Sequence, residues 1–201
     1  TYTFATEAEK AVFACGGYIA REIVAGLIIV VLNTVIYSKK HRSDPPIADY
    51  KTDPFGQFQW LRSILEDARD GNKKVYVTGH IPPIQESFAY SIGEKYWNVP
   101  FVVRYFEIVG EYQDVVAGNL FGHTHTNELR HIPLLRSDAA PLIIQSAVSP
   151  GLGNLPTFTV ASYEETSKLI TDLSKWAVEW DPIAQVWPKD RTSRIKFINQ
   201  V

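Results

Sequence analysis

The chain has 201 residues and a formal net charge of −2, with 45% hydrophobic and 21% charged residues. This is the composition of a globular domain long enough to bury a core. The charge balance argues against a nucleic-acid interface, and the apolar runs are too short for a transmembrane segment. The only cysteine, Cys15, cannot form an intrachain disulfide and is expected to be a buried free thiol.

The first part of the chain is expected to alternate between strands and helices. A β-branched run predicts a buried strand over residues 26–34, and a polar loop follows over residues 41–54. Apolar residues at helical spacing predict a helix over residues 55–70, which Asp53 can cap and Gly71 can end. The next expected elements are a strand at 74–78, a helix at 99–113 and a strand at 115–121.

Only strands are expected after residue 121. Their expected ranges are 128–132, 142–146, 157–163, 168–173, 176–180 and 194–198. Strands that first alternate with helices and then follow one another indicate the α/β class. The sheet is expected to be mixed, with antiparallel strands late in the chain.

Three histidines, His80, His123 and His125, are the candidate metal ligands. Each follows a short apolar strand and stands close to a glycine. Ligands gather at the carboxyl ends of strands in open α/β sheets, and neutral imidazole is a common zinc ligand. In an extended segment His123 and His125 would point to the same side and face one site. The alternative interpretation is that they are polar loop residues without a ligand.

Other residues are weaker candidates for a functional role. His41 lies in a basic segment, residues 39–42, that could contact an anionic substrate or simply be a solvated loop. His131 lies in an expected late strand. Three aromatic residues could form an apolar wall for a lipid or nucleoside, or could pack in the core: Tyr90, Tyr96 and Trp97.

Two motifs, Gly79-His80-Ile81-Pro82-Pro83 and Phe121-Gly122-His123-Thr124-His125, resemble the last two metal motifs of calcineurin-like metallophosphoesterases. Leu32-Asn33-Thr34 and the segment from Asp53 to Leu61 (DPFGQFQWL) make the chain similar to the acid sphingomyelinase-like branch. Endopolyphosphatases share much of this pattern.

This resemblance implies a site with two divalent metal ions, usually zinc, that bridge a hydroxide and the substrate phosphate. It implies that His80 and His123 bind one metal and that His125 binds the other. The earlier family motifs, Asp-x-His, Gly-Asp-x-x-Asp and Gly-Asn-His, are absent from this sequence. The catalytic residues are therefore expected in a missing N-terminal half, and this chain is expected to bind at most one zinc ion, weakly. No substrate-binding residue is assigned.

The resemblance implies that residues 1–201 form a partial domain, the C-terminal half of a four-layer α/β/β/α sandwich. Its motif-bearing core would cover about residues 26–163, and late strands would cover residues 164–201. The expected function is metal-dependent hydrolysis of a phosphate ester, such as a phospholipid or a nucleotide, by the full-length protein. The alternatives are an endopolyphosphatase-like hydrolase and a non-catalytic binding module. The family suggests a lysosomal, vacuolar or secreted protein, against which the single cysteine argues weakly.

Overall fold

A six-stranded mixed sheet organises the computed structural model, which describes residues 6–42, 53–85, 93, 95–131, 139–149, 154–178 and 197–200. Its strand order is β1-β2-β3-β4-β6-β5, where β2, β3, β4 and β6 are parallel and the two edge strands are antiparallel. The strands are β1 (Ile19–Val24), β2 (Leu27–Leu32), β3 (Lys74–Gly79), β4 (Val116–Phe121), β5 (Glu128–Arg130) and β6 (Leu142–Ile144).

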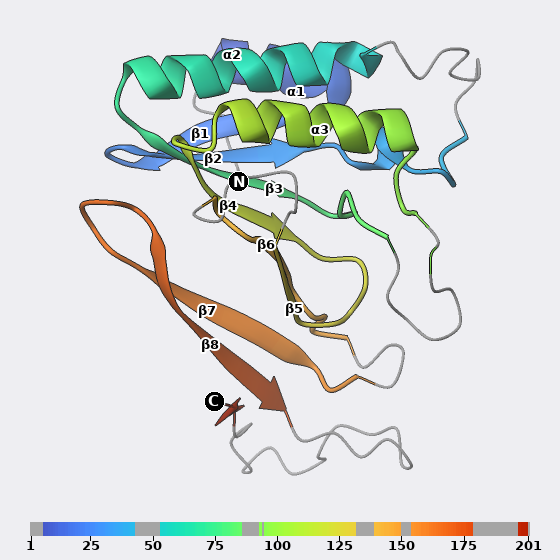
Figure 1. Ribbon diagram of the computed structural model, residues 1–201, viewed down its shortest axis with the longest axis vertical. Coiled ribbons are helices and arrows are strands. Elements are labelled where there is room, and N and C mark those ends of the chain that lie inside the picture. Colours follow the sequence, from blue (N-terminus) through green and yellow to red (C-terminus); the bar gives the residue numbers. More distant parts are fainter. Residues whose placement is uncertain are drawn as a thin grey trace.

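Two helices, α2 (Gln57–Asp70) and α3 (Val99–Glu111), cover one face of this sheet (Figure 1). Their apolar stripes form the main core together with the inward-facing residues of the parallel strands. The fully buried members include Phe58, Leu61 and Leu65 from α2, Phe101 and Tyr105 from α3, and Val30, Val75, Val77 and Leu142 from the strands. The mixed α/β class is thus confirmed.

The start of α2 follows from the capping chemistry that the sequence predicts. The Asp53 carboxylate accepts hydrogen bonds from the backbone N–H groups of Phe58 at 3.0 Å and Gln59 at 2.8 Å. A short 3-10 turn, η2 (Pro54–Gly56), comes first, and Phe55 in it has φ 59°. Because this backbone is not α-helical, the helix begins at Gln57 rather than at residue 55.

Two N-terminal elements were not predicted. The helix α1 (Glu7–Gly16) begins with a capping box, in which Thr6 accepts from the Glu9 amide and the Glu9 carboxylate accepts from the Thr6 amide. The edge strand β1 pairs antiparallel with β2. Cys15 lies in α1 and is exposed, so the expectation of a buried thiol was wrong. Its helix buries only one residue, Gly16.

A second sheet lies on the face of the six-stranded sheet opposite α2 and α3 (Figure 1). It contains β7 (Thr157–Tyr163), β8 (Ile170–Val178) and β9 (Phe197–Gln200), all antiparallel. The strands expected at 168–173 and 176–180 are one strand, since β7 pairs with β8 across Ser174 and Lys175 without a break there. Residues 179–180 and 194–196 of the expected strands lie outside the described residues.

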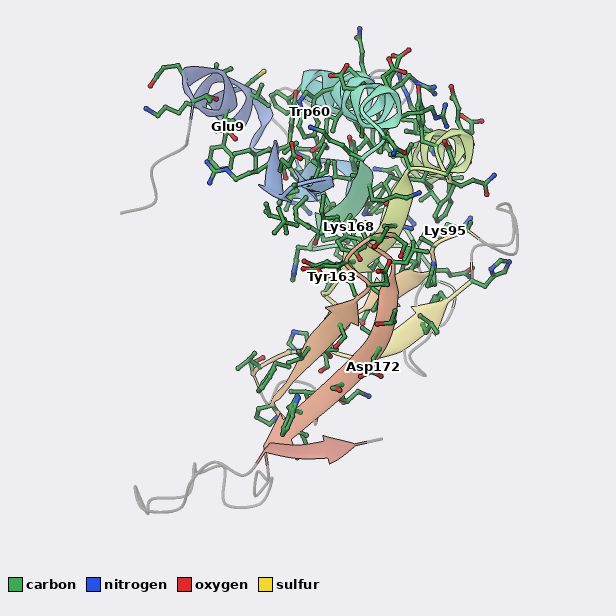
Figure 2. All side chains as sticks on the ribbon, turned by 90° about the vertical axis from the view of Figure 1, so that its left-hand side faces the viewer. Glu9, Trp60, Lys95, Tyr163, Lys168 and Asp172 are labelled. Atoms are coloured by element: carbon green, nitrogen blue, oxygen red, sulfur yellow. The ribbon has the colours of Figure 1, made fainter. Side chains whose placement is uncertain are left out.

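The two sheets touch mainly near the turn between β7 and β8. Ile170 packs against Leu27, Tyr76 and Ala117, and the Tyr76 hydroxyl donates a hydrogen bond to the carbonyl oxygen of Lys168. Figure 2 shows Tyr163 and Lys168 close to the larger sheet and Asp172 further along β8. A cavity of about 590 Å³ lies beside the Ile170 contact and is lined by residues of β4, β5, β6 and β8. None of the helices in the described part of the chain combines the length and apolarity of a membrane span.

The helix layer is expected to carry most of the stability. We expect Leu61→Ala to lower the free energy of unfolding by about 2–5 kcal/mol, because Leu61 is fully buried and its truncation leaves a cavity. Val103→Ala on α3, where the side chain is 46% exposed, should change it by less than about 0.5 kcal/mol. Urea denaturation of both variants measures the difference, and equal losses would contradict this picture of the core.

Candidate metal centre

The first two candidate ligands lie at the ends of neighbouring parallel strands. His80 follows Gly79 at the end of β3, and His123 follows β4 by two residues. The strands pair in parallel with Thr78 opposite Leu120, so both chains leave the sheet at the same edge. His123 Nδ1 and His80 Nε2 are 3.2 Å apart, and the two rings meet edge to face with centroids 5.1 Å apart.

This separation fits a shared metal ion. Two zinc–nitrogen bonds of about 2.0–2.1 Å at a tetrahedral angle place their nitrogen atoms about 3.3 Å apart. The same separation suits a hydrogen bond between a protonated and an unprotonated ring nitrogen. Both side chains are exposed, so an ion could reach them from solvent. The fold thus arranges two imidazole nitrogens as a preformed pair.

The loop that carries His123 and His125 is not extended. His123 has φ 74° and His125 has φ 59°, both in the left-handed region. Between them Thr124 is buried, and its backbone N–H donates to the Gly122 carbonyl at 2.9 Å. The expectation that extended geometry aligns the two imidazoles was therefore wrong. Backbone of this kind costs about 1–3 kcal/mol per residue and is concentrated at functional sites.

His125 is separate from the imidazole pair. Its side chain is half-buried, and its Nδ1 atom is buried without a hydrogen-bond partner among the described residues. Within those residues no group of three or more His, Cys, Asp or Glu side chains is placed to hold one metal ion. Buried polar atoms are nearly always hydrogen-bonded, so this imidazole nitrogen is an exception that needs an explanation.

Segments from two other parts of the chain lie beside the pair. The Tyr96 ring packs edge to face against His123, with centroids 5.1 Å apart. The Tyr96 carbonyl accepts a hydrogen bond of 2.9 Å from the backbone N–H of Lys39. This hydrogen bond connects the basic segment, residues 39–42, to the residue that packs on His123, and the Lys39, Lys40 and Arg42 side chains are exposed. Neither Tyr96 nor this segment was predicted to contact a specific histidine.

The remaining candidates do not join the site. Trp97 is fully buried in the core, so the aromatic-wall interpretation was wrong for it. Tyr90 lies outside the described residues. His41 is half-buried and its backbone N–H donates to the Ser38 carbonyl. His131 is exposed after β5 and lines a different cavity of about 280 Å³.

Curated proteins similar to the chain include several phosphodiesterases and an endopolyphosphatase. Sphingomyelinase phosphodiesterase D of Dictyostelium discoideum is 35% identical over 158 residues, which are 76% of this chain and 35% of that protein. Acid sphingomyelinase-like phosphodiesterase 3b of Homo sapiens is 33% identical over 159 residues, 72% of this chain and 33% of that protein. An endopolyphosphatase of Yarrowia lipolytica is 28% identical over 153 residues, 75% of this chain and 19% of that protein.

These relatives confirm the resemblance to the acid sphingomyelinase-like phosphodiesterase branch. The chain spans about a third of the length of the first two relatives. No family model matches the chain. The metal-binding roles of His80, His123 and His125 stay predictions.

The strained backbone at His123 should be detectable in the free energy of unfolding of two variants. We expect His123→Gly to have a free energy of unfolding about 1 kcal/mol higher than His123→Ala, because only glycine adopts φ 74° without strain. Both variants lose the same imidazole, so their difference reports the backbone alone. At Thr126, whose φ is not positive, the order should reverse. Equal or higher stability of His123→Ala in urea denaturation would show that the loop is not strained.

Proposed function

We propose that this chain forms the C-terminal half of the catalytic domain of a metal-dependent phosphoesterase that hydrolyses a phosphodiester or phosphomonoester. The observation that carries the proposal is the pair of imidazole nitrogens 3.2 Å apart at the ends of β3 and β4. Relatives named as sphingomyelinase phosphodiesterases support it. In this proposal His80 and His123 hold one divalent ion, and His125 belongs to the second.

The metals, proposed to be zinc, would supply Lewis-acid stabilisation of charge on the phosphate when bound. The residues of this chain contribute two of the positions around the first ion and one around the second. A catalytic zinc site usually has three protein ligands, so further ligands are required. We assign them to the N-terminal half of a four-layer sandwich. That N-terminal half would also cover the partly open face of the six-stranded sheet, where Val31 is 39% and Leu129 is 68% exposed.

Two substrate classes remain in the proposal. The exposed basic segment, residues 39–42, lies next to Tyr96 and suits an anionic phosphate chain, as does the relative named endopolyphosphatase. The larger identity to relatives named sphingomyelinase phosphodiesterases favours a phosphodiester of a lipid. We therefore put the lipid-type phosphodiester first. A lysosomal, vacuolar or secreted location fits this class and stays a prediction.

A non-catalytic binding module is the alternative from another class. It would keep the imidazole pair without the carboxylate and amide ligands of the complete site. The sequence upstream of Thr1 distinguishes the two: Gly-Asp-x-x-Asp and Gly-Asn-His motifs there support the enzyme, and their absence supports the binding module.

Zinc titration tests the assignment of the three histidines. We expect the metal-free chain to bind at most one zinc ion, because among the described residues His80 and His123 are the two candidate ligands whose ring nitrogens lie close together, 3.2 Å apart. His80→Ala and His123→Ala should each weaken binding about tenfold or more, since affinity follows ligand number. His125→Ala should have a much smaller effect.

Calorimetry of these variants, with His131→Ala as the control for an exposed imidazole that lies elsewhere, gives the comparison. If His125→Ala abolishes binding and His80→Ala leaves it unchanged, the shared-ion assignment is wrong. The Gly-His-Thr-His loop would then form a local site of its own.

We further expect the chain alone, supplied with zinc, to hydrolyse neither sphingomyelin nor bis-p-nitrophenyl phosphate. The reason is that the sequence lacks the Asp-x-His, Gly-Asp and Asn-His motifs that would complete both ion sites. Release of choline phosphate or p-nitrophenol measures the activity. Turnover that disappears in His80→Ala would show that the site is complete within these 201 residues.

A further inference from the structure

We propose that Thr34 and Trp97 are positioning residues that fix the His80 imidazole against His123: Thr34 holds the peptide between His80 and Ile81, and Trp97 holds the carbonyl group of Ile81. The inference rests on the proposed metal role of the two histidines. It assigns a role at the metal to two side chains outside the histidine motifs.

The His80–Ile81 peptide is bonded at both of its polar groups. Its N–H, on Ile81, donates to Thr34 Oγ1 at 2.8 Å in a buried environment. Its carbonyl, on His80, accepts from the backbone N–H of Gly122 at 3.0 Å. Gly122 directly precedes His123, so one peptide plane connects the end of β2 with both histidine loops. A rotation of this peptide would break two hydrogen bonds and displace His80 relative to His123.

Trp97 holds the next carbonyl group. Its indole N–H donates to the Ile81 carbonyl at 3.0 Å, and its side chain has no exposed area. The indole packs against Tyr37, Tyr105 and Phe121, with ring centroids 4.7, 5.6 and 6.5 Å away. Because the packed core fixes the indole ring, the Trp97 N–H points in a fixed direction. Its hydrogen bond therefore restricts the position of the Ile81 carbonyl in the loop that follows β3.

Thr34 also packs against the residue on the other side of His80. A Cβ atom built on Gly79 would lie 2.5 Å from Thr34 Cγ2 and 3.2 Å from Phe121 Cε1. Thr34 is 2% exposed. Its hydroxyl and its methyl group therefore contact the residues that follow and precede His80. Gln57 in turn fixes Asn33, because its side chain bonds the Asn33 N–H at 2.7 Å and the Asn33 carbonyl at 3.1 Å.

Two imidazoles that bind one metal ion need an accurately fixed separation, whereas the fold itself does not depend on the position of the His80 ring. Binding geometry must be held within about 0.5 Å for ligands to act together, and the supporting groups commonly decide it. His80 is exposed, so its own packing does not fix it. Among the described residues, the hydrogen bonds of the His80–Ile81 peptide are the contacts that can fix the position of His80.

The test compares substitutions that separate the hydroxyl from the methyl group. Thr34→Val keeps the volume and removes the acceptor, whereas Thr34→Ser keeps the acceptor and removes the methyl. Trp97→Phe removes the indole donor. Thr157→Val is the matched control, since Thr157 is also buried and its hydroxyl donates one hydrogen bond of 2.8 Å to the Leu155 carbonyl. Zinc affinity, stability to urea and hydrogen exchange of the Ile81 amide are measured for each.

We expect Thr34→Val and Trp97→Phe to weaken zinc binding about fivefold or more, in line with supporting groups of metal ligands. Exchange of the Ile81 amide should accelerate in Thr34→Val. Thr34→Ser should restore both properties even where it is less stable, and Thr157→Val should bind zinc like the unaltered chain. Unchanged zinc affinity in Thr34→Val, or no rescue by serine, would overturn this inference alone. Absence of zinc binding by the unaltered chain would overturn the proposed metal role and this inference with it.

Discussion

The parallel pairing of β3 with β4 is the constraint on which the candidate site depends. Thr78 lies opposite Leu120 in this pairing, and His80 and His123 follow these residues by two and three positions. Because parallel strands end at the same edge, residues 43 positions apart bring two ring nitrogens to 3.2 Å. A shift of the register by one residue would turn the side chains of one strand to the other face and separate the pair.

The helix layer supports this edge through buried aromatic and polar contacts. Tyr37 stacks on Phe58 of α2, and its hydroxyl accepts a hydrogen bond of 2.7 Å from Gln57. Burial raises the pKa of the Tyr37 and Tyr105 phenols, so both remain neutral hydrogen-bonding groups near neutral pH. Tyr105 donates to Asn119 of β4 at 2.8 Å. The contacts that stabilise the core thus also fix the strand ends and the loops that follow them.

Strain and packing are unevenly distributed over the molecule. The helix-covered face of the six-stranded sheet is well packed, whereas a cavity of about 590 Å³ lies between its other face and β8. The left-handed backbone of His123 and His125 lies in the loop that follows the carboxyl end of β4. Strained backbone of this kind and buried atoms without a partner, such as His125 Nδ1 among the described residues, are the features that cluster at functional sites.

Local physical chemistry determined much of this protein from sequence alone: the strands before both histidine motifs, the helix capped by Asp53 and the candidate ligands themselves. The same reasoning missed α1, although Thr6 and Glu9 carry its capping signature, and it divided β8 in two. Only the tertiary structure decided which nitrogens meet, that the His123–His125 backbone is left-handed, and that Thr34 bonds the peptide after His80. These depend on strand register and on contacts between residues far apart in the chain, which local periodicity and spacing do not encode.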